Sequence, residues 1–107
     1  LTVHRGNQVE HCAGAIAKIF ETLGGEVIYF GKPHKEIYKM CFNANEKVLA
    51  IGDNLRTDIK GANDLNIDSI FISNGVHRSE FQNENELSEL MFKYKVKINY
   101  FQSELTW

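Results

Sequence analysis

Two polar segments of the sequence hold residue types that can bind a phosphoryl group. Lys32 lies in a Gly-Lys-Pro turn directly after the apolar run 26–30, and Asp53 follows the apolar run 47–51. An ammonium group can neutralise phosphate oxygens, and an aspartate can be one of the few carboxylate ligands that Mg²⁺ takes beside waters and phosphate oxygens. If the two segments end neighbouring strands, Lys32 and Asp53 would face a single phosphoryl group.

The loop after the run 47–51 contains a second acid, Asp58, near the start of the next expected helix. Asp58 could cap this helix, or it could hold metal-bound water and the nearby backbone in place. Gly52, which opens the loop, would let the chain turn sharply as it leaves the strand. The spacing fits ordinary loop and cap aspartates equally well, and a lysine in a turn is usually a solvated charge. Only the combination of Lys32 with the acidic loop favours a functional site.

Hydrophobic periodicity predicts helices and strands in alternation along the chain. Apolar residues at three- and four-residue spacing indicate helices, and short apolar runs bounded by Gly, Pro or Asn indicate strands. Asn83 and Glu86 resemble a capping box at the start of the last helix. This order predicts an α/β fold with a parallel sheet and right-handed crossovers, in which ligands bind at the carboxyl ends of the strands. The expected helices cover 9–23, 33–42, 57–65 and 83–94, and the expected strands cover 26–30, 47–51, 68–73 and 96–100.

The composition is that of one small globular domain. The chain has 107 residues, of which 43% are hydrophobic and 24% charged, and its formal net charge is −2. The basic residues are scattered and no apolar run approaches the roughly 20 residues that span a bilayer, so we expect a cytoplasmic protein that binds neither nucleic acid nor membrane. Cys12 and Cys41 lack metal-ligand spacing and are expected to be buried free thiols. The four histidines also lack such spacing and are expected to be surface or core residues: His4, His11, His34 and His77.

The two polar segments together resemble a known family. The Gly-Lys-Pro turn at 31–33 and the stretch Gly-Asp-Asn-Leu-Arg-Thr-Asp-Ile at 52–59 are similar to the third and fourth motifs of the haloacid dehalogenase (HAD) superfamily. The closest likeness is to subfamily IIA, which includes nucleotide and p-nitrophenyl phosphatases, and it runs from about residue 12 to residue 77. This resemblance implies a partial HAD-like, Rossmann-like three-layer core that lacks the N-terminal strands and most of the cap. Residues 1–25 would be the end of the cap, and residues 26–107 a single portion of the core.

The resemblance also implies roles for individual residues. Lys32 would steady the phosphoryl group, Asp53 would contribute to Mg²⁺ binding, and Asp58 would support that site, so all three would be catalytic. The substrate would be a phosphorylated small molecule. The remaining residues of the acidic loop would shape it: Gly52, Asn54 and Thr57.

One part of the family's chemistry is absent from these 107 residues. The reaction of the family begins with an aspartate of a DxD motif on an early strand, but no DxD occurs here and the first aspartate is Asp53. Without a nucleophile, covalent catalysis does not proceed. We therefore expect the C-terminal portion of a Mg²⁺-dependent HAD-type phosphatase that is inactive alone and needs the missing N-terminal half or a homo-oligomer partner.

Two other classes of protein remain possible at this point. The first is a non-catalytic assembly or dimerisation module, because a sheet without its opening strands exposes an edge and an apolar face. The second is a phosphoacceptor receiver domain, which also combines an α/β order with acidic loops and a lysine. A receiver needs further acids earlier in the chain, and their absence before Asp53 disfavours this reading.

Overall fold

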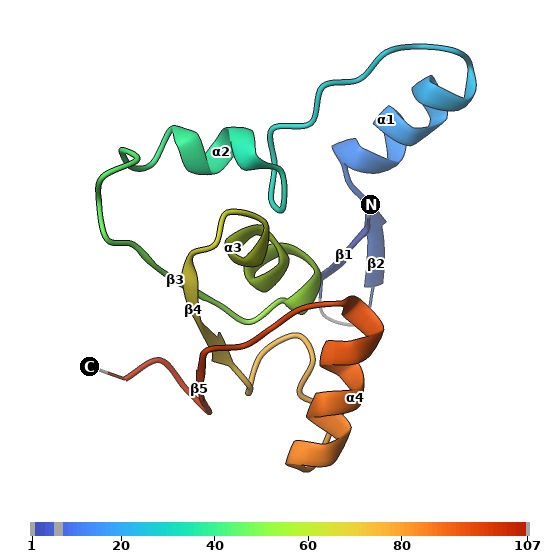
Figure 1. The fold of residues 1–107 in the computed structure, drawn as a ribbon. Coiled ribbons are helices and arrows are strands. Elements are labelled where there is room, and N and C mark those ends of the chain that lie inside the picture. Colours follow the sequence, from blue (N-terminus) through green and yellow to red (C-terminus); the bar gives the residue numbers. More distant parts are fainter. Residues whose placement is uncertain (1, 6–7, 107) are drawn as a thin grey trace.

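The computed structural model describes residues 2–5 and 8–106. It contains a small antiparallel hairpin and a separate parallel sheet of three strands in the order β3-β4-β5 (Figure 1). This arrangement confirms the predicted α/β fold with a parallel sheet. The strands are β1 (Thr2–Arg5), β2 (Gln8–His11), β3 (Leu49–Gly52), β4 (Asp68–Ile72) and β5 (Tyr100–Gln102). The helices are α1 (Ala13–Thr22), α2 (Lys35–Lys39), the π-helical turn η1 (Leu55–Ile59), α3 (Lys60–Asp64) and α4 (Glu84–Tyr94).

The core lies between one face of the parallel sheet and the helices that connect its strands. Because successive strands are neighbours in the sheet, right-handed crossovers place both connecting helices on the same face. Figure 1 shows α3 and α4 on the same side of the strands. Ser69 and Phe71 of β4 point to this side and are fully buried. The buried hydrophobic side chains that form the core cluster are Leu55, Ile59, Phe71, Leu87, Leu90 and Val96.

The opposite face of the sheet is bare in the described part of the chain. Ile51, Ile70 and Tyr100 are lateral neighbours in the register, and Leu49 lies on the same face because side chains alternate along a strand. Leu49 is 47% exposed, Ile51 39% and Tyr100 59%. Among the described residues, no strand pairs with the outer edge of β3. The chain therefore supplies the sheet and one helix layer of the expected three-layer core.

The last helix begins much as its sequence predicts. The side chain of Asn83 accepts a hydrogen bond from the Glu86 amide at 3.0 Å, which caps α4. The Glu86 side chain in turn accepts a hydrogen bond from the amide of Gln82 at 2.7 Å. In a standard capping box it would accept from the amide of the cap residue itself, Asn83. At the other end Lys95 adopts the left-handed conformation with φ 54°, which turns the chain and brings Val96 into the core.

Several of the predicted elements are wrong in position or type, and the helix predicted at 33–42 is only Lys35–Lys39. Residues 26–30 form no strand, and Ile28 and Phe30 are 79% and 56% exposed, because a strand requires a neighbour to share its hydrogen bonds. The last strand is β5 at 100–102 rather than 96–100. The reason is that Asn99 uses its side chain to accept from the Ser69 amide at 3.0 Å. The first helix begins at Ala13, because residues 8–11 form β2 instead.

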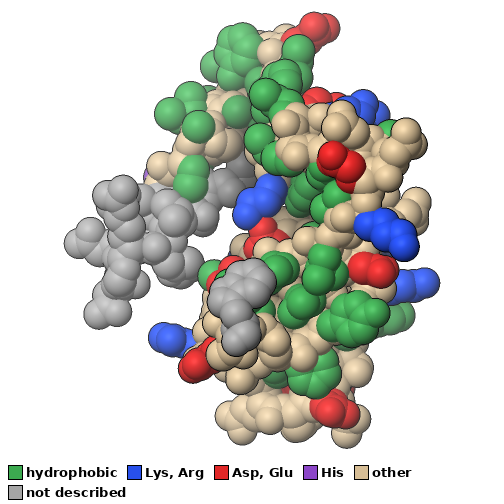
Figure 2. Space-filling model, turned by 90° about the vertical axis from the view of Figure 1, so that its left-hand side faces the viewer, with side chains coloured by type: hydrophobic (Ala, Val, Ile, Leu, Met, Phe, Trp, Pro, Cys, Tyr) green, Lys and Arg blue, Asp and Glu red, His purple; other side chains and the backbone are tan. Residues whose placement is uncertain are grey.

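The apolar stripe of α1 faces solvent rather than the sheet. Ile16, Ile19, Phe20 and Leu23 are more than half exposed. Figure 2 shows hydrophobic side chains gathered at the top of the molecule, where Figure 1 places α1 and the segment after it. No helix in the described ranges has the length and apolar character needed to cross a bilayer. The expectation of buried thiols fails for the second cysteine, because Cys41 is exposed and only Cys12 is partly buried.

Candidate functional site

Lys32 and the acidic loop after β3 are joined through Asp58. One carboxylate oxygen of Asp58 pairs with the Lys32 ammonium group, and the other accepts a hydrogen bond from the Asn54 amide at 3.1 Å. The Asp58 side chain is 11% exposed, whereas that of Lys32 is 55% exposed. Burial raises the pKa of Tyr38, and the negative charge of Asp58 adds to this effect. Asp58 is therefore a largely buried anion that ties the lysine turn to the backbone next to Asp53.

Asn54 sets the local shape of this loop. Its side-chain oxygen accepts from the Arg56 amide at 3.0 Å and its carbonyl accepts from the Asp58 amide at 2.9 Å, so Asn54 caps η1. The helix thus starts earlier than predicted, and neither Thr57 nor Asp58 caps it. Thr57 contributes through its carbonyl, which accepts from the Tyr38 hydroxyl at 3.4 Å.

Asp53 lies where the carboxyl ends of β3 and β4 meet. Its Oδ2 accepts a hydrogen bond from the Val76 amide at 3.0 Å. The side chain forms one wall of a surface depression of about 560 Å³, whose other walls come from the segment after β4. The residues that line this depression are Asp53, Asn74, Gly75, Val76, Arg78, Ser79 and Glu80.

Two glycines make room for the two carboxylates. A Cβ atom at Gly52 would lie 2.3 to 2.5 Å from side-chain atoms of Asp58, and one at Gly75 would lie 2.2 to 2.7 Å from those of Asp53. Among the described glycines only Gly24 has a positive φ, so the sharp turn expected at Gly52 is not the reason for glycine there. Both positions require the absence of a side chain rather than a special backbone conformation.

The donor set fits part of a Mg²⁺ site. Asp53 is a carboxylate at a strand end with one oxygen held by an amide, which suits a hard cation that takes few protein ligands. Asp58 is already engaged by Lys32 and Asn54. Within residues 2–5 and 8–106, no group of three or more His, Cys, Asp and Glu side chains is close enough to hold a metal. Asp53 is therefore the candidate ligand that the described residues offer at this strand end.

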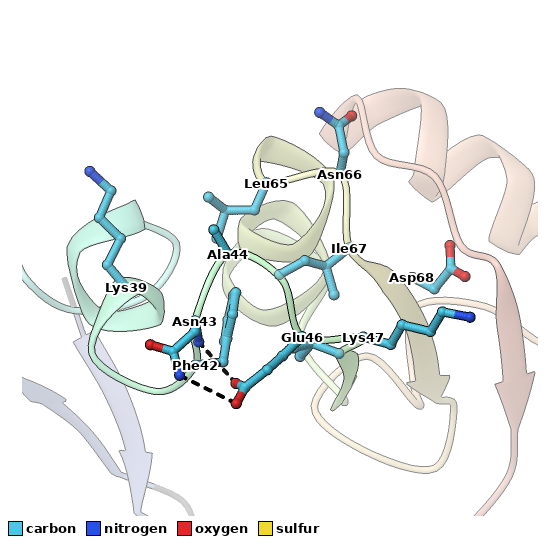
Figure 3. Close-up of a pocket in the computed structure, with 11 residues that line it drawn as sticks. Lys39, Phe42, Asn43, Ala44, Glu46, Lys47, Leu65, Asn66, Ile67 and Asp68 are labelled. Atoms are coloured by element: carbon cyan, nitrogen blue, oxygen red, sulfur yellow. Dashed lines mark hydrogen bonds between the residues drawn. The ribbon is translucent and has the colours of Figure 1, made fainter.

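A larger depression than the one beside Asp53 lies at the other end of the strands. This hollow of about 930 Å³ lies between the segment before β3 and the residues just before β4. Figure 3 shows the residues that line it. Glu46 accepts from the Asn43 amide at 2.9 Å and from its side chain at 3.3 Å on the rim. Because Lys32 and Asp53 sit at the carboxyl ends of the strands, cavity size does not point to the candidate site.

His77, which the sequence assigned only to surface or core, contacts the backbone at the start of η1, next to the acidic loop. His77 is fully buried, and its Nε2 accepts a hydrogen bond from the Leu55 amide at 3.2 Å. Its Nδ1 lies 2.7 Å from Glu80 Oε1, and the Tyr94 hydroxyl donates to the other oxygen of Glu80 at 3.3 Å. The only hint in the sequence was the position of His77 just after the strand at 68–73. Of the other histidines, His11 and His34 are exposed, and the side chain of His4 lies outside the described residues.

The carboxylate of Glu80 has a lowered pKa. Partial burial acts to raise this pKa, but the hydrogen bond from His77, the hydrogen bond from the Tyr94 hydroxyl and the charge of Lys93 together outweigh burial. A carboxylate with a lower pKa in the folded state than in the unfolded state adds stability above its unfolded pKa. That contribution disappears as the pH falls through the folded value.

Substituting Glu80 should therefore lower the free energy of unfolding less at acid pH than at neutral pH. We expect Glu80→Gln to lower the free energy of unfolding at pH 7, and the difference from the parent chain to shrink as the pH falls below the ordinary value of 4.5. Urea unfolding followed by circular dichroism between pH 7 and pH 3 measures this. Glu89→Gln, at an exposed position of α4, is the control. A difference that stays constant or grows in acid would contradict the assignment.

Comparison with known proteins agrees with this geometry. A family model described as HAD-hydrolase-like matches residues 29–93, more than half of the chain. A hydrolase of the haloacid dehalogenase-like family from Brucella suis is 30% identical with a TM-score of 0.67, over 98% of this chain and 41% of that one. The comparison with curated proteins gives no match.

Two further solved structures share the fold at lower identity. The p-nitrophenyl phosphatase from Archaeoglobus fulgidus is 16% identical with a TM-score of 0.73, over 96% of this chain and 40% of that one. A possible sugar phosphatase from Cytophaga hutchinsonii is 21% identical with a TM-score of 0.68, over 94% and 37%. The chain thus spans about two-fifths of the length of the structures it matches. With the Lys32 turn and the acidic loop placed at the carboxyl ends of the strands, the chain belongs to the HAD-like hydrolase superfamily.

Proposed function

We propose that these residues form the part of a HAD-type phosphatase that carries the phosphate-binding lysine and a magnesium-binding aspartate. By themselves they do not turn over substrate. The observation that carries this proposal is the link from Lys32 through Asp58 to the Asn54 amide, which holds the Lys32 ammonium group against the loop that also carries Asp53. In this proposal residues 1–25 are the end of the cap and residues 26–107 belong to the core.

Each charged group contributes in a different way to binding a phosphorylated small molecule. The Lys32 ammonium group, half exposed at the strand ends, neutralises oxygens of the phosphoryl group. Asp58 holds that ammonium group in position through its buried carboxylate. Asp53 supplies one ligand for Mg²⁺, which, when bound, polarises the phosphate oxygens and offsets their charge.

The missing component is a nucleophile. Phosphoryl transfer through a covalent intermediate needs an oxygen or another lone pair to attack phosphorus while the alcohol leaves. Both carboxylates of the acidic loop have partners that suit a binding role, since Asp53 accepts from the Val76 amide and Asp58 pairs with Lys32. In this proposal the attacking carboxylate comes from outside these 107 residues.

Binding without turnover is the test of this function. We expect Mg²⁺, followed by inorganic phosphate, to shift the amide resonances of Asp53 and Asn54 in a nuclear magnetic resonance titration. Asp53→Asn should weaken the Mg²⁺ step, and Lys32→Met should weaken the phosphate step. Each loss should be about tenfold or more, as for removal of a charge-assisted contact.

A matched ion pair elsewhere in the chain provides the control. Lys60 and Asp64 pair at 2.6 Å along α3 and belong to neither loop, so Lys60→Met and Asp64→Asn should leave both titrations unchanged. Hydrolysis of p-nitrophenyl phosphate by the chain with Mg²⁺ should stay at background. Turnover that Asp53→Asn abolishes would refute the claim that these residues are inert alone, and absence of any Mg²⁺ shift would refute the site.

The bare sheet face and the outer edge of β3, which is unpaired among the described residues, favour a second role, in which this chain assembles with another protein segment. Leu49 and Ile51 on that face are apolar and about half exposed, and the matched structures are more than twice as long as this chain. We propose that the occupant is the remaining part of the HAD fold, which would bring the nucleophile. This is the partner that both the open edge and the missing carboxylate require.

Mixing the chain with the remaining part of a HAD fold tests which partner covers the bare sheet face and the edge of β3. A segment carrying the DxD strand of a HAD phosphatase should co-sediment with the parent chain and restore turnover, and Ile51→Asp should prevent both. Phe92→Asp, on an 88% exposed side chain of α4, is the control and should leave complex formation intact. A stable homodimer that excludes the added segment would instead favour the dimerisation module, and a monomer that binds nothing would overturn the proposed docking.

A further inference from the structure

We propose that His77 is a positioning residue that, as a neutral imidazole, holds the Asp53 loop in its binding geometry. This inference rests on the proposed role of Asp53. His77 Nε2 accepts from the amide of Leu55, two residues after Asp53. On the other side, the amide of Val76, the residue directly before His77, donates to Asp53 Oδ2 at 3.0 Å. One buried residue thus connects the two backbone segments that enclose the candidate ligand.

The hydrogen bonds require one particular form of the ring. Because the Leu55 amide is a donor, Nε2 must present a lone pair, and the single hydrogen of the neutral ring is then on Nδ1. That hydrogen points to Glu80 Oε1 at 2.7 Å. A ring protonated on Nε2 would place two hydrogens against each other at Leu55.

Packing keeps the ring in this orientation. His77 has no exposed surface, and its ring centroid lies 6.5 Å from that of Phe71 and 5.6 Å from that of Tyr94. Tyr94 also donates to Glu80, so the carboxylate that receives the Nδ1 hydrogen is itself held. Partners that fix the orientation of a supporting group in this way are a common means of placing a metal ligand.

The amide that donates to His77 belongs to Leu55, the first residue of η1. Leu55 is fully buried, so its backbone donor has no access to water and needs an acceptor inside the protein. If this acceptor were lost, the start of η1 would have to move toward solvent, and Asp53 would move with it. A histidine that only filled the core would not have this effect on Asp53.

Two isosteric substitutions separate these roles. In His77→Gln the side-chain amide lies where Nε2 was and can still accept from Leu55, whereas in His77→Asn it lies where Nδ1 was and reaches only Glu80. Both variants lose the aromatic ring. A positioning role is therefore rescued by glutamine but not by asparagine, while a packing role is lost in both.

The wild-type ring can be tested without any substitution. The imidazole ¹⁵N spectrum of the full chain at neutral pH is expected to show a neutral ring that carries its hydrogen on Nδ1. A ring protonated on Nε2, or a cationic ring, would overturn the proposal whatever the chain binds.

The variants are then compared in a Mg²⁺ titration followed at the amides of Asp53 and Asn54. We expect His77→Gln to keep most of the parent affinity and His77→Asn to lose about 10- to 100-fold, the usual cost of removing a partner behind a metal ligand. Equal affinities in all three proteins, or equal losses in both variants, would refute the positioning role.

A second measurement separates this inference from the proposed function. Hydrogen exchange of the Leu55 amide should be slow in the parent and in His77→Gln, and fast in His77→Asn. If the parent chain binds no Mg²⁺, the proposed function fails, while the exchange rates and the ring spectrum still decide whether His77 holds the loop. A Leu55 amide equally protected in all three proteins would show that it does not.

Discussion

Phe71→Ala is expected to unfold most of the chain under conditions in which Phe101→Ala leaves it folded. Phe71 has no exposed surface and lies in β4, the middle strand, where it belongs to the core cluster formed with η1 and α4. Removing a buried phenylalanine side chain costs about 3–5 kcal/mol, from lost burial and the cavity left behind. A small domain has a total stability of only about 5–15 kcal/mol, so this loss is a large fraction of it.

Phe101 provides a control that matches Phe71 in chemistry and position. The two residues are partners in the β4–β5 register, but Phe101 is 55% exposed. Its removal should cost roughly 1 kcal/mol, since much of its surface already contacts water. Urea unfolding followed by circular dichroism gives both values. If the two variants unfold at the same urea concentration, the core does not lie where the structure has it.

Asp58→Ala is expected to cost more stability than Lys32→Ala, although the two residues form one ion pair. Loss of the Asp58 carboxylate leaves the partly buried Asn54 amide without its acceptor, at a cost of roughly 1–3 kcal/mol. Loss of Lys32 removes a partner whose side chain is 55% exposed, so water can take its place beside Asp58, and we expect a cost of about 1 kcal/mol. The buried acid therefore carries most of the structural effect.

The two substitutions should also differ at the loop itself. Hydrogen exchange of the Asn54 amide should become fast in Asp58→Ala and remain slow in Lys32→Ala. Asp58→Asn, which keeps an oxygen acceptor but loses the charge, should give an intermediate stability and a protected Asn54 amide. Loss of protection in Lys32→Ala would mean that the salt bridge, rather than the hydrogen bond to the backbone, shapes the loop.

Part of the fold follows from local patterns alone. The apolar runs at 47–51 and 68–73 became β3 and β4 within one or two residues of their predicted ends, because their residues favour a buried strand in any neighbouring context. The Asn83 cap and the apolar stripe behind it likewise predicted α4. The Gly-Lys-Pro turn and the acidic loop were sufficient to predict the family.

Other features depend on partners that no local pattern names. The run 26–30 has strand-forming residues but no neighbour to pair with among the described residues, and therefore remains without strand structure. The tail between α4 and β5 alternates like a strand, yet Val96 packs in the core and Asn99 bonds to Ser69. In both cases tertiary contacts override the preference of the segment.

The parallel α/β order, the two loops at the strand ends and the absence of an aspartate before Asp53 could all be inferred from the residues alone. The sequence left open whether Asp58 caps a helix or supports a site, and it gave His77 no role beyond surface or core. The packed fold answers both questions, because Asp58 contacts Lys32 across 26 positions of the chain and His77 contacts Leu55 across 22. Hydrogen bonds between residues that far apart depend on how the strands and helices pack, which neither periodicity nor composition records.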